Sequence, residues 1–375
     1  MTKFDRYLLS QLLVLFGFFA LVLVSLFWIN RAVLLFDRLI GDGQSALVFL
    51  EFTALGLPKL ITTVLPIATF AASVYVINRL GNESELTVMQ ATGTGPWRLA
   101  RPVLAFGLIV AAMLSVLTHV LDPLAQRQLS EREAEISQNL SARLLSEGAF
   151  LHPADGVTFY TREISKDGVL RDVFLSDRRD PAQGVIYTAA EAYLVRTGAG
   201  TTLIMVDGLA QRLTTVDARL ATAKFRDFSF DISALVRRDA GPAMSVGHLT
   251  TPEMMIPWDT LARRTQQSRG DIAEEFHARF AQPIFTVVAA MIGFSTLIIG
   301  SFSRFGVWRE VVIAFGLLIA IDGLRSGLVG VVRADAAMWP LLYLPGAIGA
   351  VLICAMLAHA ANPAWFRRRP QVAVA

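Results

Sequence analysis

The chain has 375 residues, of which 54% are hydrophobic and 17% are charged, and its formal net charge is +3. Soluble domains carry about 25% charged residues, so this composition is that of a membrane protein. The small net charge argues against nucleic-acid binding, which needs a clustered basic face. A single cysteine, Cys354, excludes an internal disulfide and suggests no thiolate metal site.

Six apolar stretches are long enough to cross a bilayer, which takes about 20 helical residues. We expect spans at 8–36, 46–77, 99–120, 272–301, 307–332 and 337–360. Pro58 and Pro66 lie inside the second span and are expected to kink or break it. The first stretch is longer than the apolar region of a signal peptide and has no cleavage pattern, so we interpret it as a retained anchor.

The polar segment after the third span contains short alternating runs separated by turn residues. These runs lie at 157–164, 170–176, 185–188 with 192–195, 202–206 and 223–232. Their spacing is typical of an antiparallel β-sandwich. In the last run, Phe228 and Phe230 fall on one face of the strand. We therefore predict a helical membrane protein with six transmembrane helices, arranged three plus three around an inserted all-β domain. Its parts would be 1–121, 122–271 and 272–375.

Lysine and arginine in short loops predict the orientation, because they collect on the cytoplasmic side. With a cytoplasmic N-terminus, the external short loops hold only Arg31, Arg38 and Arg333. The internal side then holds Lys3, Arg6, Arg79, Arg98, Arg101, Arg304, Arg309 and Arg367 to Arg369. We expect both termini in the cytoplasm and the β domain outside the membrane.

Residues 82–93, between the second and third spans, form a helix signature. Asn82 is placed to act as an N-cap with Glu85 three residues on, and Glu83 and Glu85 suit the first turn. Gly93 and the following Gly95 and Pro96 predict its end. The simplest reading is that the carboxylates only cap the helix. Its apolar residues Leu86 and Met89 favour a second reading, in which the helix fits a groove of a soluble partner.

No catalytic motif accompanies this helix. The five histidines are scattered without metal-ligand spacing, and there is neither a phosphate-binding GxxxxGK[ST] loop nor a nucleophile elbow. The sequence therefore predicts no enzyme activity, no metal site and no cofactor.

Charged residues within or near the spans are costly there and tend to mark function. Arg31, Arg38 and Lys59 gather at the external surface, where they would meet anionic headgroups non-specifically or bind a phosphorylated amphiphile in a pathway. Asp322 and Arg325 share one helix face at i,i+3 spacing. An internal ion pair and a cavity-lining role are equally consistent with that spacing.

The stretch 83–93, together with the 3-β-3 layout, resembles the lipopolysaccharide-export permeases of the LptF/LptG (YjgP/YjgQ) family. The resemblance covers nearly the whole chain, and residues 148–150, 157–160 and 172–175 are closer to the LptF branch. It implies a β-jellyroll-like periplasmic domain on an inner-membrane permease that extracts lipopolysaccharide. It further implies a paralogous permease LptG, a dimer of the ATPase LptB, and LptC with a periplasmic bridge protein.

The resemblance also assigns roles to residues. Glu85 would contact a basic residue of the ATPase, and Arg31 would face the phosphates of the lipid. Leu34 stands where the related branch has a second cation, and Lys59, Arg38 and Arg325 are further candidate lipid contacts. The acyl chains would be shielded by phenylalanines of the β domain, Phe159, Phe228 and Phe230. The rival hypothesis is a mechanotransmitting or sensory membrane protein whose β domain binds a ligand or protein.

Overall fold

A computed structural model describes residues 3–41, 46–143, 147–154, 156–165, 168–180, 183–197, 200–214, 219–231, 244–300 and 308–362. The chain forms two compact units, one of Met1–Leu129 with Met244–Ala375 and one of Ser130–Ala243. The segment after 244 therefore packs with the helices, whereas its polar sequence had grouped it with the β domain.

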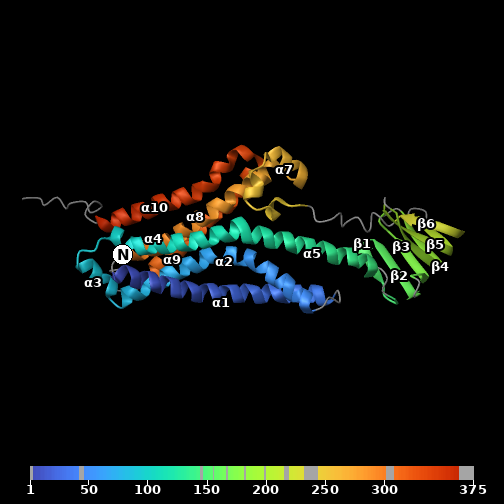
Figure 1. Ribbon diagram of the computed structural model, residues 1–375, viewed down its shortest axis with the longest axis horizontal. Helices are drawn as coiled ribbons and strands as arrows, with labels where there is room; N and C mark the ends of the chain where they lie inside the picture. The colour runs from blue at the N-terminus through green and yellow to red at the C-terminus, as the bar shows by residue number, and fades with distance from the viewer. Residues whose placement is uncertain are drawn as a thin grey trace, which may run out of the picture. The chain divides into compact units, whose positions relative to one another are not determined.

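The helical unit is built from long apolar helices, and the prediction of six membrane-length helices is confirmed for the described residues. They comprise α1 (Lys3–Gly41), α2 (Ala46–Asn82), α4 (Pro96–Val116) running through the π-helical turn η1 (Leu117–Leu121) into α5 (Asp122–Arg143), α8 (Arg269–Gly300), α9 (Trp308–Ala334), and η5 (Ala336–Tyr343) with α10 (Leu344–Ala361) (Figure 1). Helix α2 continues through Pro58 and Pro66, so of the predicted kink or break, the break does not occur. The neighbouring helices hold its backbone, which is how prolines are tolerated in membrane helices.

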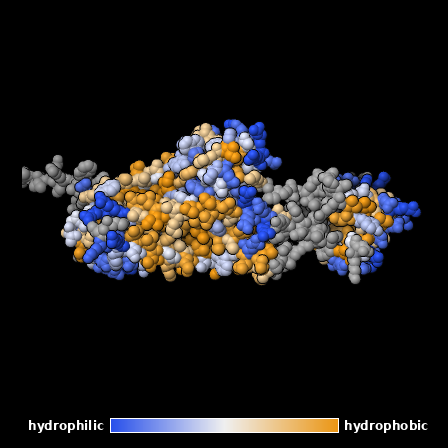
Figure 2. Space-filling view, viewed as in Figure 1, coloured by the Kyte–Doolittle hydropathy of each residue, from blue (hydrophilic) through white to orange (hydrophobic). Residues whose placement is uncertain are grey.

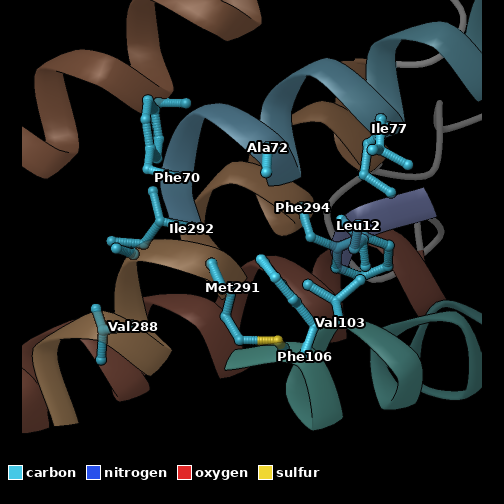
Figure 3. Close-up of a cluster of buried hydrophobic side chains, with 14 of the residues drawn as sticks. Leu12, Phe70, Ala72, Ile77, Val103, Phe106, Val288, Met291, Ile292 and Phe294 are labelled. Atoms are coloured by element: carbon cyan, nitrogen blue, oxygen red, sulfur yellow. The ribbon is translucent and has the colours of Figure 1, made fainter. Parts of the chain in front are cut away.

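Helix α8 is the centre of the bundle, because it packs against α2, α4, α9 and α10. Two polar contacts fix it to α2: Ser73 donates a hydrogen bond of 2.7 Å to the carbonyl of Ala290, and Gln282 donates one of 3.1 Å to the carbonyl of Thr62. Figure 3 shows the apolar side chains that fill this core, including Phe106.

The surface of the helical unit is largely hydrophobic, as Figure 2 shows for one face. Helices α1 and α9 contribute most to it, since few residues of their apolar windows are buried inside the chain. Exposed apolar helices of this length need lipid or another chain around them.

The second unit contains one antiparallel sheet whose strands follow one another in sequence order. The strands are β1 (Leu151–Ala154), β2 (Val157–Ile164), β3 (Leu170–Asp177), β4 (Gln183–Thr197), β5 (Gly200–Thr214) and β6 (Arg219–Asp231). The inserted all-β region is confirmed, but the described strands form a single sheet where the spacing had predicted a two-sheet sandwich. Asp207 and Gly208 had predicted a turn after the run 202–206, but they lie in the middle of β5.

At one row of residues across the sheet, the side chains that point into the core switch from one set of alternate positions to the other. The register pairs the residues on both sides of this row, and the positions that lie between those pairs, one on each of β2 to β6, are Arg162, Asp172, Ala190, Asp207 and Arg226. On β2 and β3 the buried alternation is interrupted there by two consecutive exposed residues. The positive φ angles of Asp172 and Asp207, both 50°, occur at the same row. The apolar residues on both sides of the row therefore face one common core.

Candidate functional site

The short helix between α2 and α4, α3 (Glu85–Ala91), lies at the end of the bundle that holds the N-terminal turns of α1 (Figure 1). Its end was predicted correctly. Gly93 has a φ of 86°, its N–H bonds to the carbonyl of Gln90 at 3.0 Å, and the N–H of Thr94 bonds to the carbonyl of Met89 at 3.1 Å. This pair of bonds is a Schellman motif, which needs a residue such as glycine at the left-handed position.

The start of α3 differs from the prediction. Asn82 ends α2 and does not cap α3; Ser84 occupies the cap position with a φ of 63° and no side-chain capping bond. Glu83 lies in the turn, where its carboxylate is 3.7 Å from the guanidinium of Arg79. Only Glu85 is in the first turn, where the helix dipole favours its charge. The correction arises because α2 extends farther than its apolar run.

The apolar residues of α3 are already used by this chain. Leu86 is 2% exposed within the bundle core, and Met89 packs against the same core. Leu86 is therefore not accessible to a partner groove, whereas Met89 remains partly exposed, and its contact with a partner stays a prediction. The exposed face carries Val88, which is 59% exposed, beside the half-buried Glu85.

Sequence reasoning missed two neighbours of Glu85. Tyr7 of α1 donates a hydrogen bond to its carboxylate over 3.5 Å, a contact 78 positions apart that no local pattern reveals. Val88 lies three residues after Glu85, so the two share one face of the helix. Its exposure could not be inferred without knowing where the bundle packs on α3.

The predicted lipid contacts near the far end of α1 and α2 are partly engaged within the chain. Lys59 pairs with Asp122 at 3.4 Å, and its side chain is 56% exposed while that of Asp122 is 12% exposed. Arg31 is exposed and lies against Gly56. Arg38 belongs to α1, but its side chain lies outside the described residues. The structure brings Arg31 to the α1–α2 contact and Lys59 to the start of α5.

Asp322 and Arg325 form an ion pair of 2.8 Å on α9, as one of the two interpretations of their spacing required. The guanidinium of Arg325 also lies 5.6 Å from the ring centroid of Phe285 on α8. Both side chains remain partly exposed, so the pair supports packing without being closed off from a lipid or partner.

The three phenylalanines predicted to contact acyl chains all belong to the core of the sheet. Phe159 is buried, while Phe228 and Phe230 are half-buried and pack around Tyr187, with ring centroids 4.9 and 5.6 Å away. Burial raises the pKa of the Tyr187 hydroxyl. Phe228 and Phe230 belong to the edge strand β6 and keep part of their apolar surface exposed there.

These features define a multi-pass membrane protein with an antiparallel sheet inserted between its third and fourth spans. Residues 6–359 match the family described as "Lipopolysaccharide export system permease LptF/LptG", and the chain belongs to that family.

Curated relatives match over roughly half their length. The lipopolysaccharide export system permease protein LptF of Escherichia coli (strain K12) is 24% identical over 200 residues, 53% of each chain. The uncharacterized protein RP871 of Rickettsia prowazekii (strain Madrid E) is 23% identical over 214 residues, 56% of this chain and 58% of that protein.

Proposed function

We propose that this chain is a permease subunit of an ABC transporter that extracts lipopolysaccharide from the bacterial inner membrane and passes it to a periplasmic bridge. The family match carries the proposal, because it spans the six helices, α3 and the sheet. Both termini would be cytoplasmic and the β unit periplasmic, as the distribution of lysine and arginine favours. The complex would contain the paralogue LptG, with this chain on the LptF branch, together with an LptB dimer and LptC.

In this mechanism, α3 is the part of the chain on which the ATPase acts. The helix exposes Val88 and part of the half-buried Glu85, while Leu86 fixes it to the bundle core. A basic residue of the ATPase would pair with the Glu85 carboxylate, and movement of the ATPase would then displace α3 together with the helices around it. ATP hydrolysis belongs to the partner chain, and this chain transmits the force.

Charge reversal at α3 tests the coupling role. We expect Glu85→Arg to abolish co-purification of the ATPase while the chain still inserts into the membrane, because like charges at a docking site repel. Glu83→Arg is the matched control, since Glu83 pairs with Arg79 of its own chain. Normal co-purification of the ATPase with Glu85→Arg would contradict the proposal.

The lipid would leave the membrane along the exposed faces of α1 and α9, with its phosphates near Arg31 and its acyl chains passing to Phe228 and Phe230. Apolar side chains there shield the acyl chains, which otherwise cost about 25 cal/mol for each Å² exposed to water. A photocrosslinker at Phe228 is expected to capture lipopolysaccharide only when ATP is supplied to the assembled complex. Equal labelling without ATP would argue against an energised route.

A further inference from the structure

Arg279 of α8 is a buried cation that joins two segments far apart in the sequence. The residue is 3% exposed. Its Nε donates a hydrogen bond of 3.1 Å to Glu275 in the preceding turn of α8. Its Nη1 donates to the carbonyl of Leu249 at 2.7 Å and to the hydroxyl of Thr251 at 3.2 Å. The guanidinium therefore binds α8 to the segment by which the chain returns from the β unit, which we call the return segment (residues 244–257).

Thr251 extends this network to the π-helical turn η1. Its N–H donates to the carbonyl of His119 at 3.3 Å, and its hydroxyl lies 3.2 Å from Nδ1 of the same histidine. From the other side, the hydroxyl of Thr118 donates to the carbonyl of Arg279 at 3.5 Å. Turn η1 is where the membrane span α4 continues into α5, the segment that leads to the β unit. Both segments that connect to the β unit are thus held at Arg279.

A small apolar core supports the return segment at the same place. Val246, Leu249 and Met254 are buried with Leu261 of helix α7 (Trp258–Thr265) and Ile272 of α8. Burying a guanidinium is costly unless its charge and donors find partners, and its planar fork fixes the directions of its bonds. Nε and Nη1 of Arg279 are hydrogen-bonded, while Nη2 makes no hydrogen bond within the described residues but lies 3.0 Å from the Glu275 carboxylate. The return segment is therefore attached to α8 in one defined arrangement.

Helix α8 also connects this junction to the α3 end of the bundle. α3 is joined directly to α2 and α4, and both of these helices pack along α8. A displacement of α3 that moves α2 or α4 would be communicated to α8, and from α8 through Arg279 to the return segment.

We propose that Arg279 and Thr251 are positioning residues that transmit nucleotide-driven movement of the membrane helices to the β unit. The inference rests on the proposed function in requiring an ATPase partner. It adds a specific mechanical connection: without the Thr251 hydroxyl, Arg279 loses its bond to Thr251 and Thr251 loses its side-chain contact with His119. The bonds from Arg279 to the Leu249 carbonyl and from the Thr251 N–H to the His119 carbonyl remain, so the connection is weakened and movement at α3 reaches the β unit less effectively.

Thr251→Val in the assembled complex tests this connection, because it removes one hydroxyl and keeps the side-chain shape. The matched control is Thr296→Val, since Thr296 of α8 is 4% exposed and its hydroxyl bonds to the Ile292 carbonyl of its own helix. Hydrogen exchange of residues 246–256 would be measured with and without a non-hydrolysable ATP analogue. Lipopolysaccharide released per ATP hydrolysed would be measured in parallel.

The analogue is expected to change exchange of the return segment in the parent chain and in Thr296→Val. In Thr251→Val the change should shrink by about twofold or more, with a similar loss of lipid released per ATP, as expected for a residue within a coupling network. Equal nucleotide responses in Thr251→Val and Thr296→Val would overturn the inference. So would a return segment that shows no response in the parent chain, or loss of the assembled complex in Thr251→Val, which indicates a folding role alone. A parent complex that shows the response but releases no lipid would instead overturn the proposed function.

Discussion

Arg31 of α1 and Gly56 of α2 lie against each other, so that a β-carbon placed on Gly56 would come 3.2 Å from Nε of Arg31. The arginine crosses the surface of α2 at a position that has no side chain. The location of this guanidinium, a candidate ligand for lipid phosphates, is therefore set by a glycine on the neighbouring helix.

Alanine substitution measures how restrictive this contact is. Alanine is favoured over glycine in a helix by roughly 1 kcal/mol. Gly17→Ala in α1, where nothing lies within 4 Å of the added carbon, is expected to gain stability of that order. Gly56→Ala should gain less stability than Gly17→Ala, because Arg31 must shift to make room for the added carbon. In an Arg31→Ala background, Gly56→Ala should gain as much stability as Gly17→Ala. Thermal unfolding in detergent measures these effects, and an equal gain at both glycines would show that the contact imposes no constraint.

The sequence predicted one end of α3 and failed at the other for a physical reason. The stop depends on the local chemistry of Gly93, whose positive φ angle is a property of the residue itself. The start depends on how far α2 extends, and tertiary packing of Leu80 in the bundle core carries that helix past its apolar run. Contacts such as Tyr7 with Glu85 depend on the packing of α1, so no pattern around position 85 contains them.

In the sheet and around Arg279, too, features set by local sequence were predictable and features set by tertiary contacts were not. The runs at 157–164 and 170–176 were located from alternation alone, since one face of each strand is buried. The sequence predicted breaks within the long strands β4 and β5, at residues that resemble turns. Both strands continue through these residues because they pair with each other along their length, and that pairing is not visible in either strand's own sequence. No sequence pattern distinguishes Arg279, because a lone arginine before an apolar run resembles a membrane-boundary residue and its partner Leu249 is 30 positions away.

The two sides of α3 are expected to respond differently to truncation. Leu86→Ala should lower the free energy of unfolding by about 2–5 kcal/mol, because Leu86 is buried in the bundle core. Val88→Ala should leave it within about 0.5 kcal/mol, because Val88 is exposed. If α3 docks the ATPase, Val88→Ala should instead weaken that association by about fivefold, close to 1 kcal/mol. Thermal unfolding and ATPase binding to the purified chain separate the two effects. A stability loss at Val88 with unchanged ATPase binding would contradict this assignment.

The return segment is expected to lose a stabilising interaction in acid. Hydrogen bonds of 2.7 Å from the N–H and 2.8 Å from the hydroxyl of Thr250 hold the pKa of the Glu253 carboxyl below its usual range. A carboxyl with a lowered folded-state pKa stabilises the fold above its unfolded pKa of about 4.3, and this contribution disappears as pH falls through the folded value. Glu253→Gln should therefore be less stable than the parent chain near neutral pH, and the difference should shrink as the pH falls below about 4.3 toward the folded-state pKa. Melting temperatures from neutral pH down through this range check the change, and a difference that stays constant in acid would show that the charge is not responsible.

The positive φ angle of Asp207, in the row where the core-facing positions of the sheet switch, gives a prediction about backbone conformation. Asp207 has a φ of 50°, a left-handed conformation that costs an L-residue about 1–2 kcal/mol and that aspartate and asparagine tolerate best. Asp207→Val is expected to destabilise β5 by roughly that amount, because β-branched residues are poorly suited to positive φ. Asp207→Asn should retain stability, which separates conformation from charge. Arg226→Val is the second control, since Arg226 lies in the same row and is not among the residues with positive φ. Hydrogen exchange of residues 203–210 in the full chain reports the local stability. An effect of Asn as large as that of Val would mean that the carboxylate charge, rather than the left-handed backbone, matters at this position.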